Sequence, residues 1–241
     1  MIADIPPRAN MSNALTMRMP KEIHLTGQQP NIALAMFFIP YIIFEIPSNL
    51  LMKRFTPHVW LSLCILGFGI VMLCQGFVQS FAGLCATRFF LGLLEAGIFP
   101  GSFYLISFWY AREESQKRFT VFWCSVIFAS MFGSLLATGI AKMDGVGGLS
   151  NWRWIFILEG IATILVSVLS FFLVCDFPDE VKWLTKAEKE FVLHRTRGDE
   201  TTVKVTSKDM IEFFKEPMNY LGAIMYFCKL LPILDKSYDA D

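Results

Sequence analysis

The stretch LCATRFFLGLLEAGIFPGSFYLISFWY, at residues 84–110, contains 27 residues, of which only Arg88 and Glu95 carry a charge. A helix needs about 20 predominantly apolar residues to cross the hydrocarbon core of a bilayer. A surface helix of a soluble protein has a polar face, whereas this stretch is apolar nearly all round. It therefore predicts a membrane-spanning helix.

Four further apolar stretches of similar length lie at about 31–52, 59–78, 119–140 and 152–175. Charged, polar or glycine residues interrupt them at 53–58, 79–83, 111–118 and 141–151. Residues 31–175 contain 14 charged residues among 145, whereas residues 176–241 contain 23 among 66. This distribution predicts an all-α integral membrane bundle over 31–175, followed by a water-exposed segment.

Lys and Arg are unevenly distributed among the connectors. The first and third connectors contain five of them, whereas the second and fourth contain only Lys142. Residues 176–217 add eight more. Because Lys and Arg concentrate in cytoplasmic loops, we expect both basic connectors and the segment 176–217 in the cytoplasm. The formal net charge of zero argues against nucleic acid as a partner.

The segments outside the bundle are mostly polar. Residues 1–30 contain no hydrophobic run, and we interpret them as the remnant of a first helix and an outer loop. Within 176–217, Thr185 and Glu188 form a capping box, which predicts a short amphipathic helix at about 186–197. Residues 218–241 begin an apolar run that is too short to cross a membrane, and we interpret them as the start of a further helix and a tail.

Arg88 and Glu95 are the main candidates for function, because ionisable side chains inside a membrane are costly and normally face a cavity or a partner. With Gly92 and Phe99 they occupy one helical face, on which Arg88 and Glu95 are separated by roughly 10 Å along the axis. A fixed cation can bind an anion, and a carboxylate in low dielectric can carry a proton. The alternative is that Arg88 only braces neighbouring helices.

Glu45 is a second candidate, in the span 31–52. Tyr41 and Asn49 share its face, and we assign them to substrate binding with Arg88, and Glu45 to proton coupling with Glu95. Glu45 also lies within two turns of Lys53, so a structural pairing is an open alternative. We interpret Glu159 as a helix-packing residue.

Small residues recur at helical spacing in two spans. Span 119–140 has Ser125, Ala129, Gly133 and Ala137 at four-residue intervals. Such stripes let helices approach closely in lipid, and the stripe could also bind a second copy or a longer carrier. Span 84–110 repeats the pattern with Gly92, Gly97 and Gly101.

Enzymatic sites are not indicated. None of the three histidines lies in an expected span, and the six cysteines include no Cys-x-x-Cys pair. We therefore expect no cofactor and no metal site.

Four stretches resemble fungal carriers of the major facilitator superfamily, in particular the anion:cation symporter branch of allantoate, nicotinate and pantothenate permeases. They are NIALAMFFIPYIIFEIPSNLLMKR (31–54), RFFLGLLEAGIFPGSFYLISFWYAREE (88–114), MDGVGGLSNWRWIFILEGIATI (143–164) and DFPDEVKWLTKAEKE (176–190). Arg8 resembles the end of the family's first helix, although Pro7 replaces the usual preceding acid. Met52 and Phe55 likewise depart from the family's signature between the second and third helices.

The resemblance implies a carrier of two six-helix halves. This chain would supply the N-terminal half, lacking most of helix 1, and only the start of helix 7. The spacing of Arg88 and Glu95 is similar to that in anion symporters, in which the glutamate is implicated in proton coupling. The resemblance thus implies a proton-coupled symporter of a small organic anion, such as a carboxylate, ureido acid or vitamin, in the plasma membrane. The alternative is a non-transporting, truncated membrane protein that associates with itself or with a full-length carrier.

Overall fold

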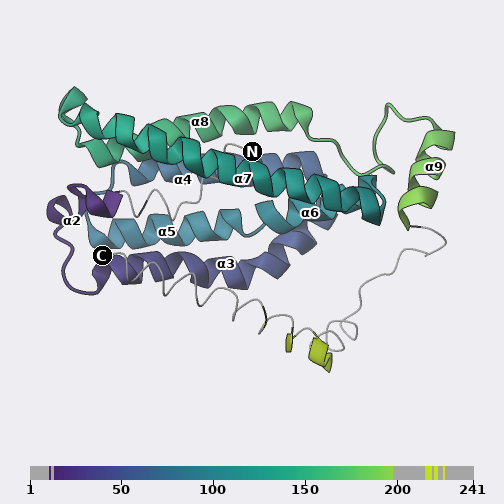
Figure 1. Cartoon of the computed structure of the whole chain (residues 1–241), viewed down its shortest axis with the longest axis horizontal. Coiled ribbons are helices and arrows are strands. Elements are labelled where there is room, and N and C mark those ends of the chain that lie inside the picture. The colour runs from purple at the N-terminus through teal and green to yellow at the C-terminus, as the bar shows by residue number, and fades with distance from the viewer. Residues whose placement is uncertain (1–10, 12–13, 198–214, 219, 222–224, 226–241) are drawn as a thin grey trace. The chain divides into compact units, whose positions relative to one another are not determined.

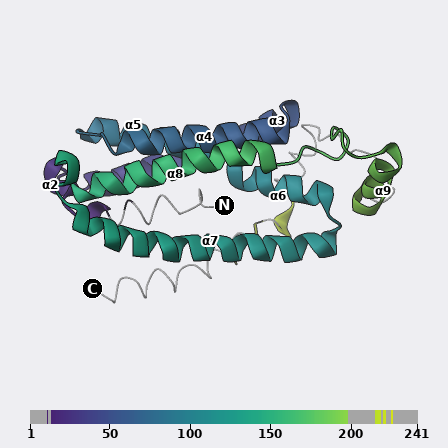
Figure 2. The ribbon, with the colours of Figure 1, turned by 90° about the horizontal axis from the view of Figure 1, so that it is seen from above.

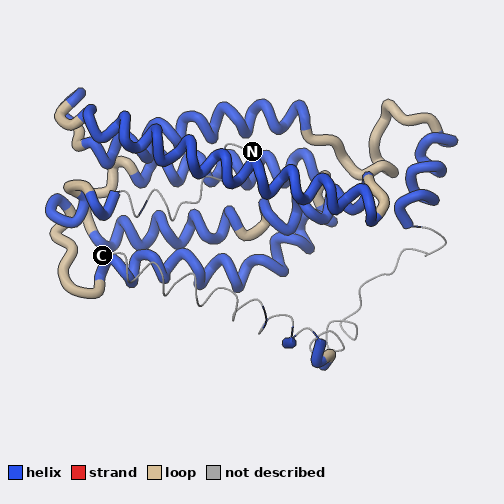
Figure 3. Tube along the Cα trace, in the orientation of Figure 1, coloured by secondary structure: helices blue, strands red, loops and turns tan. Residues whose placement is uncertain are grey.

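The computed structural model describes the chain except residues 1–10, 12–13, 198–214, 219, 222–224 and 226–241. Two compact units divide at Gly198, and the bundle belongs to the first of them. All regular secondary structure among the described residues is helical (Figures 1 and 3). The helices are α2 (Met19–Glu22), α3 (Gln29–Arg54), α4 (Pro57–Gln75), α5 (Phe81–Glu95), α6 (Ile98–Trp109), α7 (Arg112–Ile140), α8 (Asn151–Leu173) and α9 (Lys186–Arg197), with 3-10 turns η2 (Ala141–Met143) and η3 (Val146–Gly148).

Five helical stretches are long and apolar enough to cross a membrane: Gln29–Met52, Pro57–Gln75, Phe81–Trp109, Glu113–Met143 and Asn151–Leu173. Their outward-facing side chains are large and apolar, as Phe132 and Leu135 on α7 illustrate, each 70% exposed. Only lipid solvates such surfaces at low cost. The prediction of an all-α integral membrane protein is confirmed.

The spans alternate in direction, which gives the bundle two ends. We call the end that carries Arg54 and Arg118 the basic end, and the opposite end the Trp152 end. At the basic end α3, α6 and α8 finish and α4 and α7 begin.

Close backbone contacts define the pairing of the helices. α4 packs mainly against α8, and α3 against α5, as Figures 1 and 2 show. A Cβ atom at Gly160 of α8 would lie 2.7 Å from the backbone nitrogen of Leu73 on α4. Since real Cβ atoms need more space, glycine is required at this crossing.

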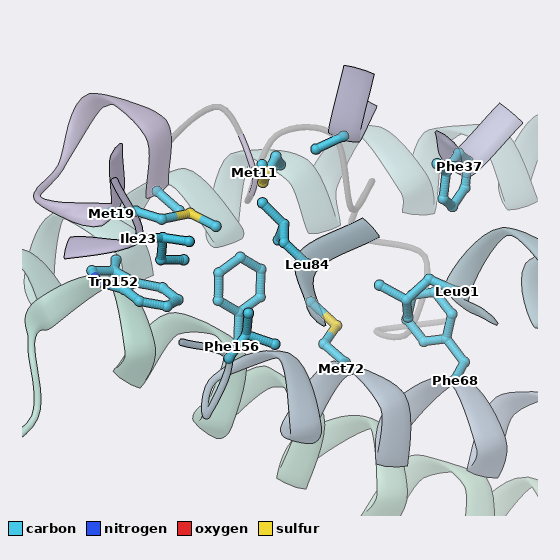
Figure 4. Packing of buried hydrophobic residues seen from close by; sticks show 13 residues of the cluster. Met11, Met19, Ile23, Phe37, Phe68, Met72, Leu84, Leu91, Trp152 and Phe156 are labelled. Carbon is cyan, nitrogen blue, oxygen red and sulfur yellow. The ribbon is translucent and has the colours of Figure 1, made fainter. Parts of the chain in front are cut away.

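The main core lies where α4, α5 and α8 meet near the Trp152 end. Figure 4 shows Met72, Leu84, Trp152 and Phe156 directed toward one another. Trp152 and Leu84 have no exposed surface. Met11, Met19 and Ile23 pack into the same cluster, so the segment before α3 is part of the fold.

The stretch 84–110, expected as one helix, is interrupted. α5 ends at Glu95 and α6 begins at Ile98, with Ala96 and Gly97 forming a turn. Pro100 explains the break, because it has no N–H to bond the carbonyl of Ala96. Both turn residues keep right-handed helical backbone angles, so the stretch still forms one span, Phe81–Trp109.

A short strap, residues 174–185, joins α8 to α9 and ties helix ends together at the basic end. The Asp176 carboxylate accepts from the backbone nitrogen of His58 at 3.3 Å and lies 2.5 Å from His58 Nδ1. Trp109 Nε1 donates to the Asp176 carbonyl at 3.0 Å. Asp176 therefore connects the start of α4, the end of α6 and the end of α8.

Helix α9 spans Lys186–Arg197 and packs against α6. Glu188 Oε2 accepts from the Thr185 backbone nitrogen and hydroxyl, both at 2.8 Å, and the Glu188 nitrogen donates back to Thr185 Oγ1 at 3.4 Å. These reciprocal bonds are the capping box that the sequence predicts. Arg195 and Glu114 form an ion pair at 2.6 Å between α9 and α7.

Candidate functional site

Arg88 is a fully buried cation in the half of the bundle nearest the Trp152 end. Its side chain is 1% exposed and its guanidinium carbon lies 6.0 Å from the centre of the Phe156 ring on α8. In the amide orientation that satisfies both groups, Gln75 Oε1 accepts from Arg88 Nε at 3.2 Å and from Nη2 at 2.9 Å. Gln75 is itself fully buried. This double hydrogen bond links α4 to α5 and orients the guanidinium.

Glu95 is the last residue of α5, immediately before the helix break. It is half-buried. It lies two turns from Arg88 on the same helix, roughly 10 Å along the axis, which is too far for a direct ion pair. Phe99, assigned to the same face, lies beyond the break and instead contacts Phe122 and Trp123 of α7.

Glu45, Tyr41 and Asn49 lie on α3, which contacts α5 and α6 at two points. A Cβ atom at Gly92 would overlap the Phe37 carbonyl oxygen, and one at Gly97 would overlap Ser48 Oγ. Tyr41 and Glu45 lie between Phe37 and Ser48 at helical spacing, so they are on the side of α3 that faces α5.

The environments of these three side chains differ. Tyr41 stacks on Phe37 with ring centroids 5.9 Å apart, and Glu45 is half-buried. The side-chain oxygen of Asn49 is buried with no hydrogen-bond partner among the described residues. Asn49 therefore has a free acceptor inside the bundle.

Two polar residues near this site were missed by the sequence analysis. Gln75 holds Arg88, and Trp60 on α4 has a buried Nε1 with no partner among the described residues. Trp60 Nε1 lies 3.4 Å from the position of a Cβ atom at Gly97. The sequence analysis considered mainly ionisable side chains within the spans and therefore overlooked both residues. Gln75 could have been found, because a glutamine inside a span needs a hydrogen-bond partner there.

The glycines of the expected packing stripe lie at the closest helix approaches. Gly92 and Gly97 contact α3, and a Cβ atom at Gly101 would lie 2.9 Å from Met52 Sδ. Without glycine at these positions, α3 could not approach α5 and α6 so closely.

The small residues of α7 face the bundle to different degrees. Ser125 and Ala129 are half-buried. Ala137 is buried and packs with Ile140 and Ile155. Gly133 is buried as well. Part of the stripe is thus covered within the chain, and its use as a docking surface for another carrier stays a prediction.

The described residues contain no group of three His, Cys, Asp or Glu side chains that could hold a metal ion. Arg88 and Gln75 lie toward the Trp152 end, whereas Asn49 and Trp60 lie toward the basic end, near Gly97. A guanidinium can bind a small anion by charge-assisted hydrogen bonds, and a carboxylate such as Glu95 can exchange a proton.

Comparison with protein families gives one match, the Major Facilitator Superfamily, over residues 8–231. An uncharacterized transporter of Schizosaccharomyces pombe is 34% identical over 225 residues, which cover 92% of this chain and 47% of the relative. A putative tartrate transporter of Agrobacterium vitis is 27% identical over 214 residues, covering 89% of this chain and 49% of that protein. The chain spans about half the length of the curated relatives it matches. The relatives are transporters rather than enzymes.

A solved structure with a similar fold is a bacterial homolog of the human lysosomal transporter Spinster, in an inward-facing and occupied conformation. It aligns with a TM-score of 0.59 and 19% sequence identity, over 73% of this chain and 42% of that chain. At this identity the likeness shows the fold alone.

Proposed function

The chain belongs to the Major Facilitator Superfamily, and on this premise we propose that it forms half of a proton-coupled carrier of small organic anions. The observation that carries the proposal is Arg88, a fully buried guanidinium that is held by Gln75 and lies on the same helix as Glu95. A buried charge is costly, and in membrane proteins it commonly marks a substrate or ion pathway.

Arg88 is the proposed anion-binding group. Its planar guanidinium matches a carboxylate in a bidentate manner, and Gln75 presets its orientation. Asn49 and Tyr41 on α3 are the proposed additional contacts. The putative tartrate transporter among the relatives supports an organic anion as the substrate class.

Glu95 is the proposed proton carrier, and Glu45 is proposed to assist it. Glu95 and Arg88 lie on the same helix, α5, so protonation of Glu95 would change the electrostatic field at an anion bound to Arg88. This offers a way to couple proton uptake to anion binding.

The proposed membrane is the plasma membrane, with the basic end in the cytoplasm. The Lys and Arg residues concentrated at that end support this orientation. The strap and α9 would then lie on the cytoplasmic side.

The test is uptake of radiolabelled tartrate into liposomes that contain the complete carrier of which this chain would form half, with an inwardly directed proton gradient. The wild type should accumulate tartrate, and a protonophore should abolish the accumulation. Glu95→Gln should lose gradient-driven accumulation while retaining exchange of internal for external tartrate. Glu113→Gln, an exposed position at the start of α7, is the matched control and should behave as the wild type.

Arg88→Lys should raise the half-saturating tartrate concentration by about tenfold, because a point charge does not reproduce the guanidinium geometry. Unchanged accumulation by Glu95→Gln would remove Glu95 from the mechanism. Absence of uptake by the wild type would contradict the proposed transport and favour the alternative, a membrane protein that associates with itself or with a longer carrier.

A further inference from the structure

Helix α9 runs across the basic end of the bundle rather than along it. Figures 1 and 2 show it steeply inclined to the membrane-spanning helices. It packs against α6, and its half-buried side chains Val192, Leu193 and Thr196 share one face at helical spacing. The other side of α9 is exposed, so this helix lies more nearly parallel to the membrane plane than the spans do, with one side free.

Contacts with the ends of two spans fix the depth of α9. The ring of Trp183, in the strap just before α9, stacks on that of Trp109 with centroids 5.9 Å apart and planes 7° from parallel. Trp109 is the last residue of its span, and Glu114 lies at the start of the next one. Arg195, in the last turn of α9, pairs with Glu114 at 2.6 Å. Because both contacts are with span ends, α9 lies where the hydrocarbon core meets water.

Two large aromatic side chains are exposed at this level. Trp183 is 69% exposed and Phe191, on the free side of α9, is 64% exposed. Neither belongs to a membrane-spanning segment. Tryptophan is enriched where membranes meet water, and helices that lie in this interface bury phenylalanine or tryptophan side chains among the lipids. At the depth of α9 these rings are level with the headgroups and the first part of the acyl chains.

The charge of the same segment is complementary to an anionic surface. Residues 182–197 contain five Lys or Arg and two Glu. One of these acids, Glu188, is already bound by Thr185 in the capping box, whereas Lys182 and Lys186 are exposed. Three acids of the strap precede this segment, and the first of them is held by the start of α4. A basic segment beside exposed aromatic rings is the combination that attracts anionic lipids.

We propose that α9 and Trp183 form an interfacial anchor that binds the anionic phospholipids of the leaflet at the basic end. Phe191 and Trp183 would insert at the boundary between headgroups and acyl chains, and Lys182 and Lys186 would bind lipid phosphates. The anchor would hold the strap at the membrane surface, and with it the ends of α4, α6 and α8 that the strap joins. It is separate from the Arg88 region and does not depend on which solute the carrier transports.

The test is hydrogen exchange of the full chain in lipid nanodiscs, measured by mass spectrometry. Discs of phosphatidylcholine alone are compared with discs that also contain phosphatidylserine in both leaflets, so the result does not depend on the orientation of the chain. Amides of residues 186–197 should exchange about tenfold more slowly in the anionic discs. High salt should remove this difference, because it screens the attraction between lysine side chains and lipid phosphates.

A matched pair of double variants tests the basic residues. Lys182→Gln combined with Lys186→Gln should remove most of the difference between the two kinds of disc. Lys21→Gln combined with Lys142→Gln removes the same charge from exposed positions at the Trp152 end, and the difference should persist in that variant.

A second pair tests the aromatic insertion. Phe191→Ser should speed exchange of residues 186–197 about fivefold in both kinds of disc, because the exposed ring loses its contact with lipid rather than with the protein. Val146→Ser, at an exposed apolar position outside the spans at the other end of the bundle, should leave that exchange unchanged.

Three outcomes would overturn the proposal. Equal exchange of residues 186–197 in the two kinds of disc would exclude anionic lipid as the partner. The same loss in the Lys21 and Lys142 double variant would show a general effect of net charge. Slow exchange that appears only in the complete carrier, and is there independent of lipid composition, would make the other half of the carrier the partner of this surface.

Discussion

Gln75 on α4 holds the guanidinium of Arg88 on α5 through two hydrogen bonds, at 3.2 Å from Nε and 2.9 Å from Nη2. Both side chains are buried, so the pair links two spans inside the membrane. Arg88 can therefore brace two helices and also serve as a fixed cation, because the hydrogen bonds that join α4 to α5 fix the direction of the guanidinium. Orientation by Gln75 supports the proposed role of Arg88 in binding a planar anion.

Replacing Gln75 by leucine should destabilise the fold by about 2 kcal/mol, because it removes two hydrogen bonds from a buried cation. The measurement is the free energy of unfolding in mixed micelles titrated with dodecyl sulfate. Gln79→Leu, at an exposed position four residues later, is the control and should change stability by less than about 0.5 kcal/mol. Equal effects of the two substitutions would contradict a structural role for the Gln75–Arg88 pair.

The candidate site could be predicted only in part. The composition of span 84–110 identifies Arg88 and Glu95, because charges in an apolar run are conspicuous. Gln75 is uncharged and lies in a different span, so its partnership with Arg88 depends on how α4 and α5 are rotated. The His58–Asp176 contact joins residues 118 positions apart, and no local pattern encodes it.

The glycine at position 92 should not tolerate a side chain. A methyl group there would overlap the Phe37 carbonyl oxygen, so Gly92→Ala should separate α3 from α5 and cost about 1–3 kcal/mol. Gly139→Ala is the control, because a Cβ atom at Gly139 meets nothing within 4 Å. In the helix α7 this change should be neutral or stabilising by about 0.5 kcal/mol. The measurement is the same unfolding titration in mixed micelles. A Gly92→Ala variant as stable as the wild type would contradict the close packing of α3 on α5.

The break between α5 and α6 shows why hydropathy alone gives an incomplete fold. Apolar composition predicts that 84–110 crosses the membrane, and it does so with a turn at Ala96 and Gly97. Proline at position 100 signals a disturbed helix, but proline also occurs at 40 and 47 within the continuous helix α3. The presence of a proline in an apolar run therefore does not by itself predict where a helix is interrupted.

Glu22 should anchor the segment before α3 to the start of α8. Its carboxylate accepts from Trp152 Nε1 at 3.0 Å and from the Ser150 hydroxyl, and lies 3.5 Å from Arg153 Nε. Glu22→Ala should therefore cost about 2 kcal/mol, since it leaves a buried indole N–H without its acceptor. Hydrogen exchange should speed up in residues 19–25, whereas Glu113→Ala should leave that exchange unchanged. Unaltered hydrogen exchange in Glu22→Ala would mean that the apolar packing of Met19 and Ile23 alone holds this segment in place.

Helix α9 should lose stability in acid because of its capping box. The Thr185 backbone N–H and then its hydroxyl hold the pKa of Glu188 below its ordinary value of 4.5. A carboxyl group whose pKa is lowered by folding stabilises the folded state above its ordinary pKa, and this contribution is lost as the pH falls through the lowered value. Amide exchange of residues 186–190, corrected for intrinsic rates, should show full protection near pH 6 and reduced protection below about pH 4.

Two variants separate this effect from general acid denaturation. Glu188→Gln retains an acceptor but cannot titrate, so its protection should be lower at pH 6 and independent of pH down to the onset of global unfolding. Thr185→Ala removes the hydroxyl that bonds Glu188 in both directions and should cost about 1 kcal/mol of helix stability. The ion pair of Arg195 with Glu114 is largely exposed and contributes less than about 1 kcal/mol, so it should not mask the change. If Glu188→Gln loses protection at the same pH as the wild type, another acid controls α9, and the capping box has no part in its pH dependence.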